Sequence, residues 1–129
     1  MTAMTRTQLS GSDHLTKRVA QVRAGFVETL DERILDLEGL KAMVIKGQRR
    51  GEALQAIANQ AHRIRGVAGT LGFESLGTLA GKVDEAYAEF CSAPSRSHEE
   101  LVAFWRANSP ALEAMLDEME RLMDSAPPA

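Results

Sequence analysis

Residues 61–73, with the sequence Ala-His-Arg-Ile-Arg-Gly-Val-Ala-Gly-Thr-Leu-Gly-Phe, form the stretch around which this chain is organised. Successive residues on a helix turn by about 100°, so side chains three and four positions apart lie on one face. At that spacing one face of this stretch, and of the residues just before it, is apolar, which predicts a helix packed against a core. The apolar positions are Leu54, Ile57, Ala61, Ile64, Ala68 and Leu71.

A second face of the same predicted helix is polar at first and then lacks side chains. It consists, in order, of Gln55, Asn59, His62, Gly66 and Gly69. A glycine costs a helix interior about 1 kcal/mol relative to alanine, so two of them close to a histidine require a reason. We infer that the glycines leave room for a large partner to approach His62 closely.

The rest of the chain indicates further amphipathic helices joined by short loops. Apolar residues at helical spacing predict four helices in all, near residues 12–46, 52–70, 74–90 and 97–124. Ser12 or Asp13 is expected to cap the first helix, and Gly72 to end the second in a left-handed conformation. Ser97 and Glu100 are spaced as a capping box at the start of the last helix.

Four amphipathic helices with short connections predict an all-α fold, an up-and-down antiparallel four-helix bundle. A break near Gly25 would leave an extra N-terminal helical segment. Ser109-Pro110 predicts either a kink in the last helix or a new helix capped by Ser109. We expect one domain at residues 12–124, between flexible tails at 1–11 and 125–129.

Composition restricts the functional class. The chain has 129 residues, a net charge of −3 and a single cysteine, Cys91. A negative net charge with dispersed lysines and arginines argues against general nucleic-acid binding. No apolar run is long enough to cross a membrane or to form a signal peptide, and a lone cysteine fits a reducing compartment, so we expect a cytoplasmic protein. The chain has neither a Glu-x-x-His pair nor a Cys/His cluster, and we expect no metal or other cofactor.

The helical hairpin predicted around Phe73 brings a carboxylate to His62. Asp84 lies as far after Phe73 as His62 lies before it, so the two residues should lie level on adjacent antiparallel helices. A carboxylate in that place can accept a hydrogen bond from Nδ1–H, which sets the tautomer and leaves the Nε2 lone pair facing solvent. A neutral, exposed Nε2 is a competent nucleophile for phosphorus.

Other side chains suit the same chemistry. Arg65 is three residues from His62, so its guanidinium can lie beside the imidazole and bind phosphoryl oxygens through a bidentate fork. Gln55 and Asn59 are expected to hydrogen-bond a partner at the edge of the contact, and Arg63 adds positive charge nearby.

Residues 62–72, His-Arg-Ile-Arg-Gly-Val-Ala-Gly-Thr-Leu-Gly, resemble the phosphoacceptor helix of histidine-containing phosphotransfer (HPt) domains. That family has the pattern His-x-x-Lys-Gly, followed by Gly, Leu or Val, and Gly at these offsets. The resemblance implies that His62 is the phosphoacceptor, that Arg65 takes the place of the usual basic residue and that Gly66 provides clearance. Arg65 stands where lysine is more usual, and Asp84 is shorter than the Glu or Gln usual on the next helix.

The resemblance further implies a phosphorelay intermediate in two-component signalling. Such a protein takes a phosphoryl group from the aspartate of one response-regulator receiver domain and passes it to another, and a hybrid histidine kinase can also be a partner. No nucleotide-binding glycine loop is present, so we expect no autonomous kinase activity. Two alternatives stay open, namely a module that binds and sequesters receivers without phosphotransfer, and a structural helical bundle. We expect a monomer, because every apolar face of the predicted helices has a partner in the bundle.

Overall fold

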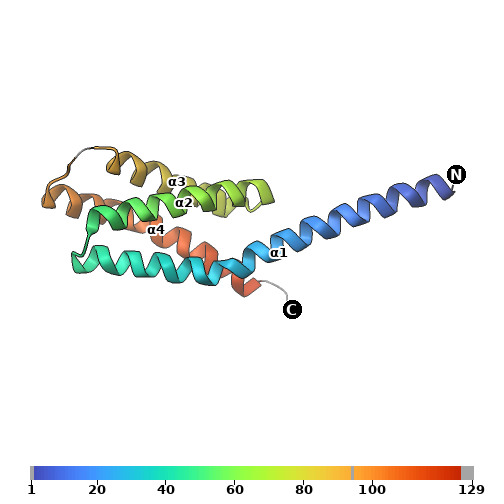
Figure 1. Cartoon of the computed structure of the whole chain (residues 1–129), viewed down its shortest axis with the longest axis horizontal. Helices are drawn as coiled ribbons and strands as arrows, with labels where there is room; N and C mark the ends of the chain where they lie inside the picture. The colour runs from blue at the N-terminus through green and yellow to red at the C-terminus, as the bar shows by residue number, and fades with distance from the viewer. Residues whose placement is uncertain (1, 94, 126–129) are drawn as a thin grey trace.

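The computed structural model describes the backbone of residues 2–93 and 95–125, and side chains from residue 13 onward within those ranges. The described chain forms four helices, α1 (Thr2–Lys46), α2 (Arg50–Leu71), α3 (Glu74–Cys91) and α4 (His98–Ser125). Each helix packs against its neighbours along the chain and α1 also packs against α4, so the four surround one core (Figure 1). The predicted all-α four-helix bundle is confirmed.

Local sequence signals set the helix ends that matter for the candidate site. Gly72 follows α2 in the left-handed conformation, with a φ of 82°, and its N–H donates to the Ala68 carbonyl. The connection to α3 is therefore only Gly72 and Phe73, and such a short loop makes α2 and α3 an antiparallel hairpin. At α4 the predicted capping box forms: the Glu100 N–H donates to Ser97 Oγ (3.1 Å), and the Ser97 N–H donates to the Glu100 carboxylate (3.3 Å).

Burial of the apolar face of α2 determines where His62 points. Ala61 and Ile64 have no exposed surface, because they face the core between the helices. His62 and Arg65 each follow a buried residue, and the turn of the helix directs both side chains to the surface. The core that α2 packs against comes from all four helices, and its largest fully buried side chains are Leu30, Leu37, Leu54, Ile57, Ile64, Leu76, Val83, Tyr87, Leu112, Met115, Leu116 and Met119.

The last helix is a single element that completes this core. α4 runs unbroken through Pro110, so Ser109 does not cap a new helix. Met115 and Met119 are fully buried between the helices. They act as flexible packing residues of the core.

The first helix is longer than the sequence predicts. It begins at Thr2, so a start at Ser12 or Asp13 is wrong, and the residues expected to form a flexible tail at 1–11 have helical backbone from Thr2 onward. It also continues through Gly25 without a break. Adding residues to an existing helix costs little compared with nucleating one, and residues 2–11 contain no proline to stop it. The tail expected at 125–129 lies outside the described residues, except for Ser125, which ends α4.

The first part of α1 projects beyond the bundle (Figure 1). Leu15, Val19 and Val22 lie on this part at helical spacing, and they are 66%, 48% and 57% exposed. Phe26, one turn further on, is the first of the described α1 side chains that is buried in the core. The expectation that every apolar face is covered within the bundle is therefore wrong for residues 15–22.

Candidate functional site

The histidine that the sequence singles out stands on the outer surface of the α2–α3 hairpin. The His62 side chain is 76% exposed. Its Nδ1 lies 3.0 Å from Oδ2 of Asp84, which is on α3. With Nδ1 as the donor, this hydrogen bond sets the tautomer and leaves Nε2 with its lone pair free. Within the described part of the chain, Asp84 is the hydrogen-bond partner of this ring.

Asp84 is held in place by its position at the edge of the core. Its side chain is only 13% exposed, and the preceding residue, Val83, is fully buried. A buried carboxylate requires hydrogen-bond partners, and for Asp84 the described residues supply the His62 ring and the Arg65 guanidinium. The aspartate is therefore fixed between α2 and α3, where it orients the imidazole.

Arg65 extends along α3. Its guanidinium Nη1 lies 3.4 Å from Asp84 Oδ2, the same oxygen that contacts the imidazole, and 3.4 Å from Glu85 Oε1. The guanidinium also lies against Gly81, where a Cβ atom would come within 3.3 Å of Arg65 Nε. In this structure Arg65 is therefore on the side of the ring that carries Nδ1.

Sequence reasoning did not find Gly81 and Glu85. Gly81 follows Phe73 by as many residues as Arg65 precedes it, so the register that places Asp84 level with His62 also places Gly81 level with Arg65. The same register pairs Gly69 with Gly77, and a Cβ at Gly77 would lie 3.6 Å from the Gly69 backbone nitrogen. Counting residues from the turn at Phe73 would thus have been enough to predict that Gly81 lies next to Arg65.

The other predicted partner-binding residues lie around His62 and Arg65. A shallow hollow of about 350 Å³ on one side is lined by Gln55, Asn59, His62, Arg63 and Asp84, together with two alanines. The Gln55 amide donates to the Asn59 side-chain oxygen across 3.1 Å, so these two side chains are ordered by each other.

Two glycines complete the predicted set. Gly69 lines a second hollow, of about 670 Å³, on the Arg65 side of the site. Gly66 is exposed on α2, and a Cβ placed there would meet nothing within 4 Å. The glycine face of α2 is thus open to solvent and is not filled by other parts of the protein.

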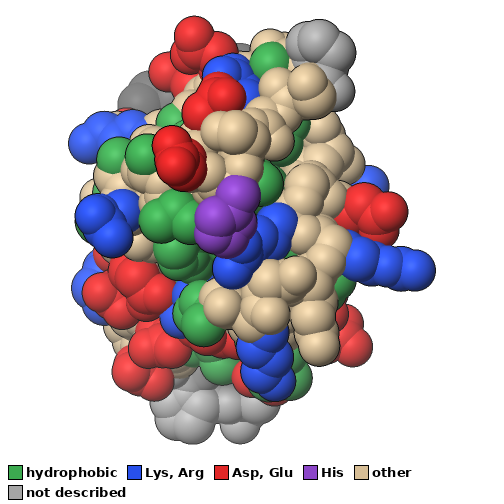
Figure 2. Space-filling model, turned by 90° about the vertical axis from the view of Figure 1, so that its left-hand side faces the viewer, with side chains coloured by type: hydrophobic (Ala, Val, Ile, Leu, Met, Phe, Trp, Pro, Cys, Tyr) green, Lys and Arg blue, Asp and Glu red, His purple; other side chains and the backbone are tan. Residues whose placement is uncertain are grey.

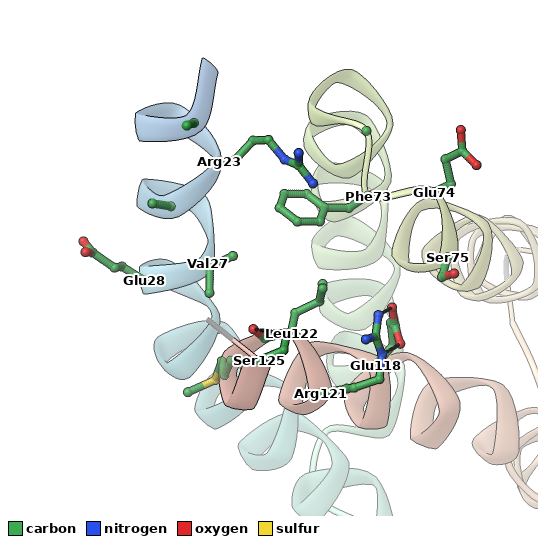
Figure 3. A pocket seen from close by; sticks show the side chains of 14 residues that line it. Arg23, Val27, Glu28, Phe73, Glu74, Ser75, Glu118, Arg121, Leu122 and Ser125 are labelled. Carbon is green, nitrogen blue, oxygen red and sulfur yellow. Dashed lines mark hydrogen bonds and ion pairs between the residues drawn. The ribbon is translucent and has the colours of Figure 1, made fainter. Parts of the chain in front are cut away.

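A larger hollow in the described part of the chain lies elsewhere. It has a volume of about 970 Å³ and lies between α1, the α2–α3 turn and the end of α4 (Figure 3). Arg23 reaches across it and stacks over the Phe73 ring at 4.6 Å, while Arg121 is paired with Glu118. This hollow shares no residue with the two beside His62 and Arg65, apart from Glu74 at the rim.

At the end of the bundle away from the α2–α3 turn, charged side chains do not form a surface of one sign that would indicate a partner. Acidic and basic side chains are mixed there, around the α1–α2 and α3–α4 connections (Figure 2). Among the described residues, no group of three or more His, Cys, Asp or Glu side chains could hold a metal ion. In the same part of the chain, no helix is both long enough and apolar enough to cross a membrane.

Comparison with known proteins gives one match. The family model described as "Hpt domain" matches residues 21–122, which include His62, Arg65, Asp84, all of α2 and α3 and most of α4. The match begins after most of the projecting part of α1. No curated protein and no solved structure matches the chain.

Proposed function

This chain belongs to the Hpt domain family, and on that basis we propose that it is a phosphorelay intermediate of two-component signalling. In this proposal His62 accepts a phosphoryl group from the aspartyl phosphate of one receiver domain and passes it to another receiver. The observation that carries the proposal is the exposed His62 ring, whose Nδ1 is held by a buried carboxylate while Nε2 stays open to solvent.

The chemistry follows from that arrangement. The Nε2 lone pair forms a bond to phosphorus while the bond from phosphorus to the receiver's aspartyl oxygen breaks, which returns the receiver carboxylate. The ring then carries a positive charge, which the Nδ1–H shares with Asp84 at 3.0 Å. Transfer to the next receiver is the reverse step with a different carboxylate as the acceptor. Phosphoryl transfer of this kind depends mainly on positioning and on stabilisation of charge.

The surroundings of His62 supply both requirements. Arg65, three residues along α2, is within reach of the phosphoryl oxygens and can pair with them. Gln55, Asn59 and Arg63 line the hollow next to the ring and offer hydrogen bonds and charge to a receiver. Gly66 leaves the surface one turn from His62 without a side chain, so a receiver can bring its aspartate close enough to react.

Transfer of label from a receiver tests the proposal. A receiver domain carrying a radiolabelled aspartyl phosphate is mixed with the wild-type protein and with the His62→Gln variant. We expect label on the wild type that survives alkali, as phosphohistidine does and aspartyl phosphate does not, and no label on the variant. A panel of receivers is required, because a relay protein serves only particular partners.

The test also separates the alternatives. If both proteins bind receivers equally and neither is labelled, the protein is a docking module that sequesters receivers. If no receiver of the same organism binds or transfers label, the bundle is structural and the motif is accidental. Label on both proteins would show that a residue other than His62 is the phosphoacceptor.

A further inference from the structure

We propose that α3 carries a seat for the Arg65 guanidinium, built from Gly81, Asp84 and Glu85, which holds this cation away from Nε2 until His62 is phosphorylated. In this proposal Glu85 is a positioning residue: it competes with the phosphoryl group for Arg65 and so sets how strongly the protein retains the phosphoryl group. The inference rests on the proposed function and deepens it.

The first support is the fit between Arg65 and Gly81. Gly81 is buried in the middle of α3, where glycine costs about 1 kcal/mol of helix stability relative to alanine. The atoms that cover it belong to Arg65, because a Cβ there would approach Nε at 3.3 Å, Cζ at 3.5 Å and Cδ at 3.6 Å. The missing side chain at Gly81 is what allows the arginine to lie flat on α3.

The second support is the charge around the guanidinium. Nη1 of Arg65 lies 3.4 Å from Oδ2 of Asp84 and 3.4 Å from Oε1 of Glu85, so two carboxylates share one cation. Asp84 is buried and already accepts the Nδ1 hydrogen bond of His62, whereas the Glu85 side chain is 73% exposed. Among the residues that the structure describes, Arg65 is the ion-pair partner of Glu85.

Geometry shows why the seat matters for the reaction. Nδ1 and Nε2 point away from each other across the five-membered ring, and Arg65 contacts the carboxylate on the Nδ1 side. A phosphoryl group bonded to Nε2 would therefore lie beyond the far edge of the ring. In the proposed exchange the guanidinium leaves Glu85 to pair with the phosphoryl group, and the charge-assisted hydrogen bonds that it gains must be stronger than those that it gives up. Removing the Glu85 charge should lower the free energy needed to release Arg65, and it should therefore favour the phosphorylated protein.

The variant that tests this is Glu85→Gln, which keeps the shape of the side chain and removes its charge. The matched control is Glu89→Gln, which makes the same change one turn further along the exposed face of α3. The measurement is the equilibrium distribution of labelled phosphoryl groups between a receiver and the full chain. We expect Glu85→Gln to shift that distribution towards His62 by about two- to five-fold, the range for an exposed ion pair, and Glu89→Gln to leave it unchanged.

A double-mutant cycle shows whether Glu85 acts through Arg65. In an Arg65→Gln background, Glu85→Gln should have no further effect on the distribution. A wild-type distribution in the Glu85→Gln single variant would overturn the proposal. So would a shift of equal size in the Arg65→Gln background, because Glu85 would then act by direct repulsion of the phosphoryl group.

A second measurement does not depend on any receiver. Phosphoramidate is used to phosphorylate the ¹⁵N-labelled protein directly, and the Nε–H resonance of Arg65 is followed by NMR. We expect this resonance to move on phosphorylation of the wild type, and to be displaced already in unphosphorylated Glu85→Gln. An unmoved resonance in phosphorylated protein would refute the seat, even if receivers transfer label normally. Phosphorylation by phosphoramidate without any transfer from receivers would refute the proposed function. The Arg65 resonance would then still show whether the guanidinium leaves its seat on phosphorylation.

Discussion

Gly66→Gln places a side chain on the exposed face of α2, one turn from His62, at a position where a Cβ atom has nothing within 4 Å. Because Gly66 is exposed and a Cβ there meets nothing within 4 Å, we expect the new side chain to extend into solvent without a clash. Glutamine is a better helix former than glycine by about 0.5 kcal/mol, so the free energy of unfolding should rise by that amount. For a domain of this size such a change raises the Tm by about 1–3 °C.

The same substitution should stop phosphotransfer. A receiver has to bring its aspartyl phosphate to bonding distance of Nε2, and a glutamine beside the ring occupies the surface that the receiver must cover. A displacement of about 1 Å at the reacting atoms can lower a rate by about 100-fold, so we expect at least that loss in the rate of label transfer. Gly39→Gln on α1 is the matched control, because Gly39 is also an exposed helical glycine whose Cβ site is empty. It should raise stability equally and leave the transfer rate unchanged.

Urea denaturation and transfer kinetics on the same preparations check both parts. If Gly66→Gln transfers label at the wild-type rate while both variants are stabilised, the glycine does not serve receiver access and our explanation of the glycine face is refuted. If Gly66→Gln is destabilised while Gly39→Gln is stabilised, the space beside Gly66 is not empty and the loss of transfer would have a structural cause.

Three further predictions concern the rest of the bundle. Tyr87 is fully buried and donates a hydrogen bond to the Asn108 carbonyl (2.9 Å), so Tyr87→Phe should lower the free energy of unfolding by about 1 kcal/mol in urea titrations, and an unchanged midpoint would contradict this. Burial raises the pKa of the Cys91 thiol above its ordinary value, so alkylation by iodoacetamide near neutral pH should be slower than for the urea-unfolded chain; equal rates would exclude that burial. Hydrogen bonds from Arg121 lower the pKa of Glu118 below its ordinary value of 4.5, so the folded state is stabilised above that pH and loses this contribution as the pH falls through the lowered pKa. In urea titrations, the loss of stability on acidification should be smaller in Glu118→Gln than in the wild type, and an equal loss in both would contradict the assignment.

Much of the fold was predictable because helix formation is a local property with a short period. The apolar spacing along α2 and α3 identified both helices, and Gly72 marked the turn between them through its left-handed φ of 82°. Once a two-residue connection joins two helices, their register is nearly determined. This is why Asp84 could be placed opposite His62 from the sequence, and why the same count would also have placed Gly81 opposite Arg65.

The length of α1 was not predictable in the same way. Residues 2–11 have few apolar side chains, so periodicity gave no signal there, although nothing in them ends a helix that is already formed. Leu15, Val19 and Val22 fit the apolar pattern of α1 as well as Phe26 does, yet only Phe26 reaches the core. The pattern tells which face of a helix is apolar, but not where the neighbouring helices stop covering it.

The sequence by itself determined the four-helix bundle, the surface position of His62 and the carboxylate beside it, because these follow from helical periodicity and from one tight turn. Only the tertiary structure decided where Arg65 points and which charges share it. A long, flexible side chain has many rotamers of similar energy, and the choice among them depends on groups brought near it by folding. Here those groups are the backbone at Gly81, which carries no side chain, and the carboxylates of Asp84 and Glu85.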